Sequence, residues 1–250
     1  VTLKLLPLPP YRAALSVGMP SIAAAAKGLR RIFRAGFLPS ALEIADEFTL
    51  KAATQRTGSR RLSGCHGHLI VELDGQEKSV RSELQDVKRL LEPLKPRFVD
   101  RALGAEAVEA IWQLRREFSY SLRDTGLVKL NEDIVVPRGC LEKLLAFTAR
   151  LQKKHGMPVA CFGHAGDGNI HVNVMVDDTQ AGHEQRRDAA LDELFRWIVK
   201  HDGVITGEHG IGIAKKRWWP VAAGPEVRRL HQAVKDALDP KGIMNPGKFL

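Results

Sequence analysis

The sequence of 250 residues predicts an α+β protein: a mainly antiparallel sheet with helices packed on one face, plus a C-terminal helical segment. Stretches with apolar residues at strand spacing alternate with stretches at helical spacing, in short units along the whole chain. These units contain neither a βαβ glycine fingerprint nor a long run of parallel strands. An apolar fraction of 44% and a charged fraction of 27% are ordinary for a soluble globular protein.

The first half of the chain begins with a strand pattern, in which Val1, Leu3 and Leu5 alternate with other residues before prolines end it. Apolar and small residues then dominate from Tyr11 to Ala26. The other elements expected in this half are a helix over 22–35, a short strand and a helix within 40–53, a strand over 67–75, and amphipathic helices over 79–94 and 104–122.

The second half shows the same alternation, and its helices end at glycine or carry basic residues in the last turn. The elements expected here are strands over 133–137, 158–164 and 169–178, and helices over 138–156, 181–203 and 225–238. The chain then ends in "LDPKGIMNPGKFL".

Composition narrows the classes of function. The net charge of +9 is compatible with nucleic acid, an acidic membrane surface, an anionic substrate or an acidic partner. The basic residues are scattered and no block of them is interleaved with aromatic residues, so we expect no nucleic-acid partner. Three distant cysteines without a CxxC pair favour a reducing compartment over a disulfide framework.

The sequence also bears on membrane association and location. No apolar run approaches the roughly 20 residues that span a bilayer. The first residues lack the apolar core and small-residue cleavage site of a signal peptide. We therefore expect a cytoplasmic protein, peripheral to a membrane only through partners.

The stretch "GHAGDGNIH" (163–171) predicts a hairpin carrying two histidines. Asp167 and Gly168 form a pair favoured in two-residue turns. With that turn His164 would face His171 across the strands, close enough for both rings to reach one metal ion. Ile170 and every second residue after it would face the core, leaving His171 on a polar face. Two solvated or hydrogen-bonded histidines are the alternative interpretation of the same pattern.

The stretch "ITGEHGIG" (205–212) is rich in glycine, which lets the backbone pass close to another group. Glu208 could complete a His-His-Glu site with positions left open for substrate. His209 has the pKa range of a general base near neutral pH. A glycine-rich turn with an exposed Glu-His pair is the alternative.

A pair of cations, Arg115 and Lys129, is a third candidate feature. Two cations can clamp a carboxylate, and arginine does so with two parallel hydrogen bonds. Arg116 and Arg123 are competing candidates, and solvated surface charge is the alternative for all four.

Together, "GHAGDGNIH", "TGEHGIG" and "LDPKGIMNPGKFL" resemble the C-terminal part of the FAD-linked 2-hydroxy acid dehydrogenases. That family includes D-lactate dehydrogenase, D-2-hydroxyglutarate dehydrogenase and the flavin subunit of glycolate oxidase, all of the vanillyl-alcohol oxidase type. The resemblance covers nearly the whole chain. The three motifs occur in the order and spacing of the family.

The resemblance implies roles for individual residues. His164, His171 and Glu208 match the metal ligands of the family, and His209 matches its proposed base. The other matched positions are Arg115 and Lys129 for the substrate carboxylate, Asn173 near the substrate, Ser119 where relatives can have threonine, and Asn245 close to the flavin.

The implied reaction oxidises D-lactate, D-2-hydroxyglutarate or glycolate to the 2-oxo acid, with hydride transfer to FAD. The implied cofactors are FAD and a divalent metal, zinc first, with manganese or iron as alternatives. The implied partners are a small anionic 2-hydroxy acid, an FAD domain upstream or on another chain, and an electron acceptor that is a protein or a quinone. A homodimer is compatible with the sequence.

The resemblance also divides the chain. Residues 1–10 match the end of an FAD-binding domain, 11–215 a substrate and metal domain, and 216–250 a helix and NPGK tail returning toward the flavin. Most of the FAD-binding domain would precede Val1, so the chain alone is expected to be inactive. The alternatives are a non-catalytic binding module that has lost its flavin domain, and a metal-dependent hydrolase, which the NPGK tail disfavours.

Overall fold

The computed structural model describes residues 2–250 and shows one seven-stranded sheet in which every pair of neighbours is antiparallel. The strand order is β4-β1-β3-β2-β6-β7-β5. The strands are β1 (Tyr11–Met19), β2 (Ala41–Asp46), β3 (Gly67–Gly75), β4 (Phe98–Leu103), β5 (Val128–Val135), β6 (Val159–His164) and β7 (Asn169–Val176). The predicted α+β class is confirmed.

Within the described residues, eight α-helices and three short 3-10 turns connect or follow the strands. The helices are α1 (Ile22–Arg34), α2 (Glu47–Thr57), α3 (Glu77–Leu91), α4 (Ala105–Arg123), α5 (Leu141–His155), α6 (His183–Lys200), α7 (Trp219–Ala222) and α8 (Pro225–Leu238). The 3-10 turns are Glu92–Leu94, Arg138–Cys140 and Lys216–Trp218.

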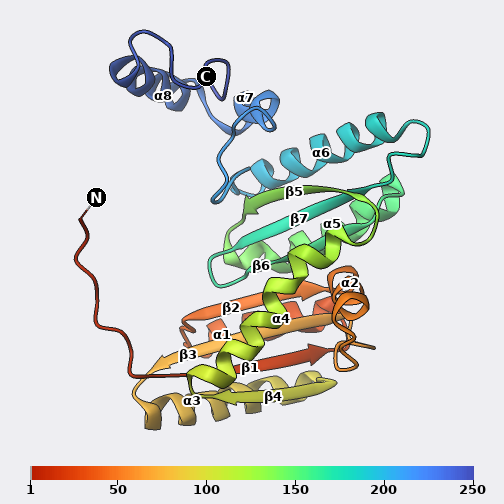
Figure 1. Cartoon of the computed structure of the whole chain (residues 1–250), viewed down its shortest axis with the longest axis vertical. Helices are drawn as coiled ribbons and strands as arrows, with labels where there is room; N and C mark the ends of the chain where they lie inside the picture. Colours follow the sequence, from red (N-terminus) through yellow and green to blue (C-terminus); the bar gives the residue numbers. More distant parts are fainter. Residues whose placement is uncertain (1) are drawn as a thin grey trace.

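The main core lies between the sheet and α1, α3, α5 and α6, which cover one face. Alternate residues of the strands point into this core, for example Leu15 of β1 and Val172 of β7, both fully buried. Two further helices, α2 and α4, lie against the opposite face, where Phe118 of α4 packs on Phe162 of β6. Figure 1 shows α4 crossing the front of the sheet.

The helix on the second face corrects one expectation. Ile170, Val172, Val174 and Val176 face the main core as predicted. The other side of β7 carries His171, Asn173 and Met175, as predicted, but Asn173 and Met175 are both fully buried there. The second face is thus a buried layer under α4 in which polar residues such as Asn173 lie beside an apolar cluster that includes Phe162 and Met175.

The hairpin that joins β6 to β7 has another register than predicted. Phe162 pairs with His171 and His164 with Asn169, so the two histidines are not directly opposed. The connection is a four-residue loop, 165–168, in which the Gly166 N–H donates to the Leu42 carbonyl of β2 at 2.9 Å. This tertiary hydrogen bond, unlike the local Asp-Gly preference, fixes where the turn falls.

Three strands differ from the prediction. Neither β1 nor β4 is among the predicted strands, and β5 begins at Val128, five residues before the predicted start. The strand expected from the alternation of Val1, Leu3 and Leu5 is not formed by the described residues of this segment, 2–9, and Val1 lies outside the described residues. A strand needs a hydrogen-bonded neighbour, and no part of 2–250 pairs with this segment.

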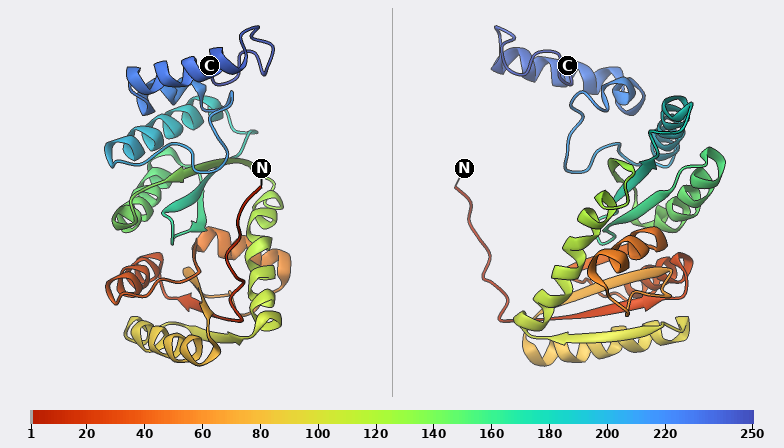
Figure 2. Two further views of the ribbon diagram at one scale, coloured as in Figure 1. Left: turned by 90° about the vertical axis from the view of Figure 1, so that its left-hand side faces the viewer. Right: turned by 45° about the vertical axis from the view of Figure 1, so that its right-hand side comes forward.

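Two parts of the chain stand apart from the sheet. The N-terminal segment carries exposed leucines, among them Leu6 at 91%, and no residue of α8 is buried. Figure 2 shows both segments projecting away from the layers of sheet and helix. Within residues 2–250, none of the helices combines the length and apolar character needed to cross a bilayer.

Candidate functional site

A cavity of about 350 Å³ lies between α4 and the second face of the sheet. Helix α4, β5, β6, β7 and the glycine-rich segment after α6 all contribute to its wall. Its lining residues are Trp112, Arg115, Arg116, Ser119, Asn131, Phe162, His164, His171 and His209. Five of the residues proposed from the sequence therefore face one space, although they come from four separate parts of the chain.

The three histidines form a row along one wall of this cavity. The ring centroids of His164 and His171 are 6.0 Å apart, and those of His171 and His209 are 5.7 Å apart and nearly parallel. Burial lowers the pKa of His171 to about 4, so this ring is neutral at pH 7. Its Nδ1 is buried without a hydrogen-bond partner among the described residues.

Glu208 lies at the open side of the row. Its side chain is 63% exposed, and Oε1 is 4.0 Å from Nε2 of His164. Across residues 2–250, no three His, Cys, Asp or Glu side chains are spaced so that they hold one metal ion together. The sequence therefore identified side chains that do gather, but in this structure they form an ion pair at the limit of contact.

Asp133, which the sequence analysis missed, anchors the glycine-rich segment. One of its carboxylate oxygens accepts hydrogen bonds from the backbone N–H groups of Gly207, Glu208 and His209, at 2.6–2.9 Å. The other accepts from Nδ2 of Asn169 at 2.8 Å. Burial raises the pKa of Asp133, but these hydrogen bonds outweigh it and hold the pKa well below its usual value. The carboxylate therefore stays charged and fixes the Glu208-His209 backbone.

A buried lysine, Lys215, also holds the glycine-rich segment in place. Nζ of Lys215 donates to the carbonyls of Ile205 and Asp133, at 2.7 and 3.0 Å, and lies 3.6 Å from Oε2 of Glu132. Burial is the main reason that the pKa of Lys215 is lowered. These contacts join the two ends of the loop to β5.

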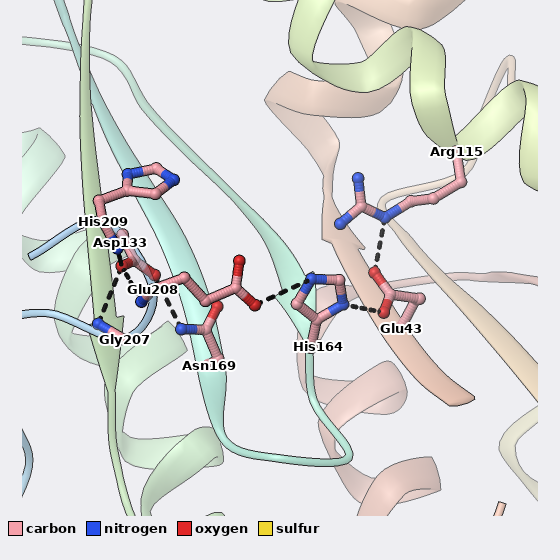
Figure 3. Close-up of polar contacts among 8 residues, drawn as sticks. All are labelled: Glu43, Arg115, Asp133, His164, Asn169, Gly207, Glu208 and His209. Carbon is pink, nitrogen blue, oxygen red and sulfur yellow. Dashed lines mark hydrogen bonds and ion pairs between the residues drawn. The ribbon is translucent and has the colours of Figure 1, made fainter. Parts of the chain in front are cut away.

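Glu43 of β2 is the second residue that the sequence analysis missed. Its Oε2 accepts from Nε of Arg115 at 2.6 Å, and its Oε1 lies 2.5 Å from Nδ1 of His164. Figure 3 shows these contacts continuing through His164 to Glu208. Burial raises the pKa of Glu43, but the hydrogen bond from His164 and the charge of Arg115 outweigh it, and the pKa is lowered. The same hydrogen bond raises the pKa of His164.

A signal for both missed residues was present in the sequence. Glu43 is a charged residue inside the otherwise apolar strand pattern "ALEIA", and Asp133 directly precedes the apolar run "IVV". Charged side chains are rarely buried unless they are paired, so an acid in such a strand implies a partner. The identity of the partner is not encoded locally.

The two predicted cations lie near the same aromatic ring. The guanidinium of Arg115 is 4.8 Å from the Phe162 ring centroid, and Nζ of Lys129 is 5.9 Å from it. Nζ of Lys129 donates to Oγ of Ser119 at 2.7 Å. Burial, followed by the nearby charge of Arg123, lowers the pKa of Lys129. Of the competing cations, Arg116 lines the cavity but pairs with Glu109.

The two asparagines proposed from the sequence, Asn173 and Asn245, occupy different environments. Asn173 is fully buried, and its Nδ2 donates to the carbonyls of Ala160 and His171, both at 3.1 Å. Its Oδ1 and that of Asn131, the residue opposite on β5, have no partner among the described residues. Asn245 is exposed in the segment after α8 and does not line this cavity.

This chain is similar to known proteins of one family. A family model described as FAD linked oxidases, C-terminal domain, matches residues 8–249. The glycolate oxidase subunit GlcD of Escherichia coli (strain K12) is 30% identical over 250 residues, covering 99% of this chain and 50% of that protein. The mitochondrial D-lactate dehydrogenase [cytochrome] of Arabidopsis thaliana is 27% identical, with 100% and 44% covered. The chain thus spans about half the length of these relatives.

The fold also has solved counterparts. The structure of 4-ethylphenol oxidase from Gulosibacter chungangensis superposes with a TM-score of 0.70 at 15% sequence identity, covering 99% of this chain and 55% of that one. At this identity the likeness concerns the fold alone.

Proposed function

Because this chain belongs to the family of FAD-linked oxidase C-terminal domains, we propose that it is the substrate- and metal-binding part of a flavin-dependent dehydrogenase. The substrate is a D-2-hydroxy acid, such as D-lactate, D-2-hydroxyglutarate or glycolate, and the product is the 2-oxo acid. The observation that carries this proposal is the convergence of Arg115, His164, His171 and His209 on one cavity.

The side chains divide the work of substrate binding and proton transfer. Arg115 and Lys129 receive the substrate carboxylate, and Ser119 holds Nζ of Lys129 in place. His209 takes the proton of the substrate hydroxyl, because its backbone is fixed by Asp133 while its ring faces the cavity. Bound FAD supplies the acceptor for the hydride that leaves Cα.

By ligand type His164, His171 and Glu208 suit a divalent metal, which they would hold by moving closer together than they lie in this structure. Two imidazoles and one carboxylate suit zinc, with manganese or iron as alternatives. Two observations support the fit: His171 is neutral at pH 7, and a ring nitrogen of His171 is buried without a partner among the described residues. A metal bound here would lower the pKa of the substrate hydroxyl.

The remaining parts of the proposal concern the flavin. Residues 11–215 form the substrate and metal domain, whereas residues 216–250 return toward a flavin-binding part, bringing Asn245 close to the flavin. The hydrogen bond from the Phe249 N–H to the Gly212 carbonyl, 3.1 Å, supports this by joining the tail to the segment that carries Glu208. A protein or quinone accepts the electrons from the flavin.

The first test measures metal content. Under metal-replete conditions we expect about one divalent ion per wild-type chain and its loss in His171→Ala, because that variant removes one of the three ligands. A wild-type chain without a stoichiometric ion would show that the ligand assignment is wrong.

The second test measures turnover with the chain joined to an FAD-binding domain. D-lactate or D-2-hydroxyglutarate should reduce an electron-accepting dye, and His209→Ala should lower kcat by about 10²–10⁴. The control is His66→Ala, because His66 pairs with Glu47 outside the cavity. FAD-loaded protein without activity on any hydroxy acid would favour a binding module instead.

A further inference from the structure

The Glu43 carboxylate is buried at the meeting point of the sheet and α4. Glu43 lies in the middle of β2, which pairs with β3 on one side and β6 on the other, and only 2% of the residue is exposed. An ionised carboxylate at such a position is strongly destabilising unless it is paired and hydrogen-bonded. Its surroundings therefore have to supply partners for both oxygens.

The two oxygens have separate partners on opposite sides. Oε2 accepts from Nε of Arg115 at 2.6 Å, and Oε1 contacts Nδ1 of His164 at 2.5 Å. Neither partner is a neighbour in sequence, since Arg115 is 72 residues away and His164 is 121 residues away. Glu43 is thus the only described residue that contacts both a proposed metal ligand and a proposed substrate-binding cation through hydrogen bonds.

Each contact constrains what its partner can offer to the cavity. A carboxylate only accepts, so Nδ1 of His164 carries the proton and Nε2 of the neutral ring keeps its lone pair. That Nε2 is the atom directed at Glu208, 4.0 Å away. On the other side only Nε of Arg115 is used, which leaves both Nη groups for a substrate carboxylate.

We propose that Glu43 is a positioning residue of this site, which orients His164 for metal binding through one oxygen and Arg115 for substrate binding through the other. Carboxylates commonly orient metal-binding histidines in this way. The proposal rests on the proposed function. It adds that a single buried charge links the two binding tasks.

The variant Glu43→Gln tests the proposal with nearly unchanged shape. An arginine Nε–H can only donate, so Arg115 requires the single oxygen of the new amide, and the NH₂ group is left to face His164. Nδ1 of His164 must then accept, which moves the ring proton to Nε2 and blocks the nitrogen that would bind the metal.

The matched control is Glu72→Gln. Glu72 lies on the neighbouring strand β3, is 8% exposed and accepts from Nε1 of Trp112 on the same helix at 2.5 Å. It makes no contact with His164. Loosening of α4 alone would therefore affect both variants, whereas the proposed role affects only Glu43→Gln.

The first readout is the ring tautomer of His164, measured by ¹⁵N NMR without metal at a pH where the ring is neutral. We expect the proton on Nδ1 in the wild type and in Glu72→Gln, and on Nε2 in Glu43→Gln. A wild-type ring protonated on Nε2 overturns the proposal even if the variant does not fold. So does an unchanged tautomer in folded Glu43→Gln.

The second readout is the affinity of the chain for Mn²⁺, measured by calorimetry. We expect a loss of about 10- to 100-fold in Glu43→Gln and wild-type affinity in Glu72→Gln. Equal affinity in all three proteins, or equal loss in both variants, overturns the proposal. A wild type that binds no Mn²⁺ or other divalent ion overturns the metal assignment itself, whereas the tautomers still decide what Glu43 does to His164.

Discussion

At the scale of single residues, the site depends on charged groups that are buried and fully paired. Asp133 is completely buried and accepts four hydrogen bonds, three of them from consecutive backbone N–H groups of 207–209. Hydrogen bonds to a charged group contribute more than those between neutral groups. This one carboxylate therefore gives the glycine-rich segment a defined conformation.

Replacing Asp133 by Asn should release that segment. The amide oxygen can accept only part of these hydrogen bonds, and its NH₂ group meets donors. We expect a loss of about 2–3 kcal/mol in the free energy of unfolding. Amide hydrogen exchange at Gly207, Glu208 and His209 should also become faster. The control is Asp167→Asn, an acid in the β6–β7 loop that is not fully buried; equal losses in both variants would contradict the anchoring role.

A buried histidine on β3, His68, makes the free energy of unfolding depend on pH. His68 is 1% exposed, and its Nε2 lies 2.8 Å from Oγ of Ser16. Burial lowers its pKa from 6.5 to about 4. Between these two values the unfolded chain binds the proton more readily than the folded chain, so stability is lost as the pH falls through this window.

From pH 7 to pH 5, His68 should cost the wild type about 2 kcal/mol of unfolding free energy. His68→Gln keeps a polar side chain but has no group that titrates in this range. Urea unfolding of both proteins at the two pH values measures the difference between their losses. Identical losses would show that His68 is not the responsible group.

At the scale of elements, the polar side of the β5–β6–β7 unit forms the site. Helices and strands with clear periodicity, such as α1, α5 and β3, are predicted to within a few residues. The predicted β5 is too short, because its first half alternates apolar residues with the polar Lys129 and Asn131, of which Asn131 lines the cavity. These polar residues interrupt the apolar pattern from which a strand is predicted.

The loop between β6 and β7 sets which residues face each other. Gly168 has φ of +79°, and a Cβ there would lie 2.1 Å from the carbonyl oxygen of Val136. Gly58, at the end of α2, has φ of +67° with open space around it. Both glycines have a positive φ that would be strained for a residue with a Cβ, but only Gly168 also lacks space for one.

We expect Gly58→Ala to cost about 1–2 kcal/mol from backbone strain alone. Gly168→Ala should lower the free energy of unfolding by clearly more, because β5 and β7 must also separate to make room for the added methyl group. Urea unfolding of both variants measures this. Equal costs would mean that the loop adjusts without disturbing the strands.

At the scale of the whole molecule, the chain consists of a layered body and two exposed segments. Leu230 is 65% exposed and Val234 is 51% exposed, on the apolar side of α8, and no residue of α8 is buried. By contrast Leu194 of α6 is fully buried in the main core. The body is therefore expected to be stable independently of α8.

The double variant Leu230→Lys and Val234→Lys should change the free energy of unfolding by less than about 0.5 kcal/mol, because both residues are more than half exposed to water. Leu194→Lys is the control and should prevent folding or cost more than about 4 kcal/mol. Thermal unfolding measures both. A large loss in the double variant would mean that α8 contributes to the core.

The sequence alone determined the α+β class, most element boundaries, the three motifs and the family, because these depend on local periodicity and on short runs of residues. It also indicated the histidines and Arg115 that line the cavity. Only the tertiary structure decided the hairpin register, the burial of the second face under α4, and the roles of Glu43 and Asp133. These depend on contacts between residues far apart in the sequence; the contacts of Glu43 with Arg115 and His164, for example, span 72 and 121 positions. Local patterns do not encode such contacts, since a buried charge shows that a partner is needed but not where the fold will place it.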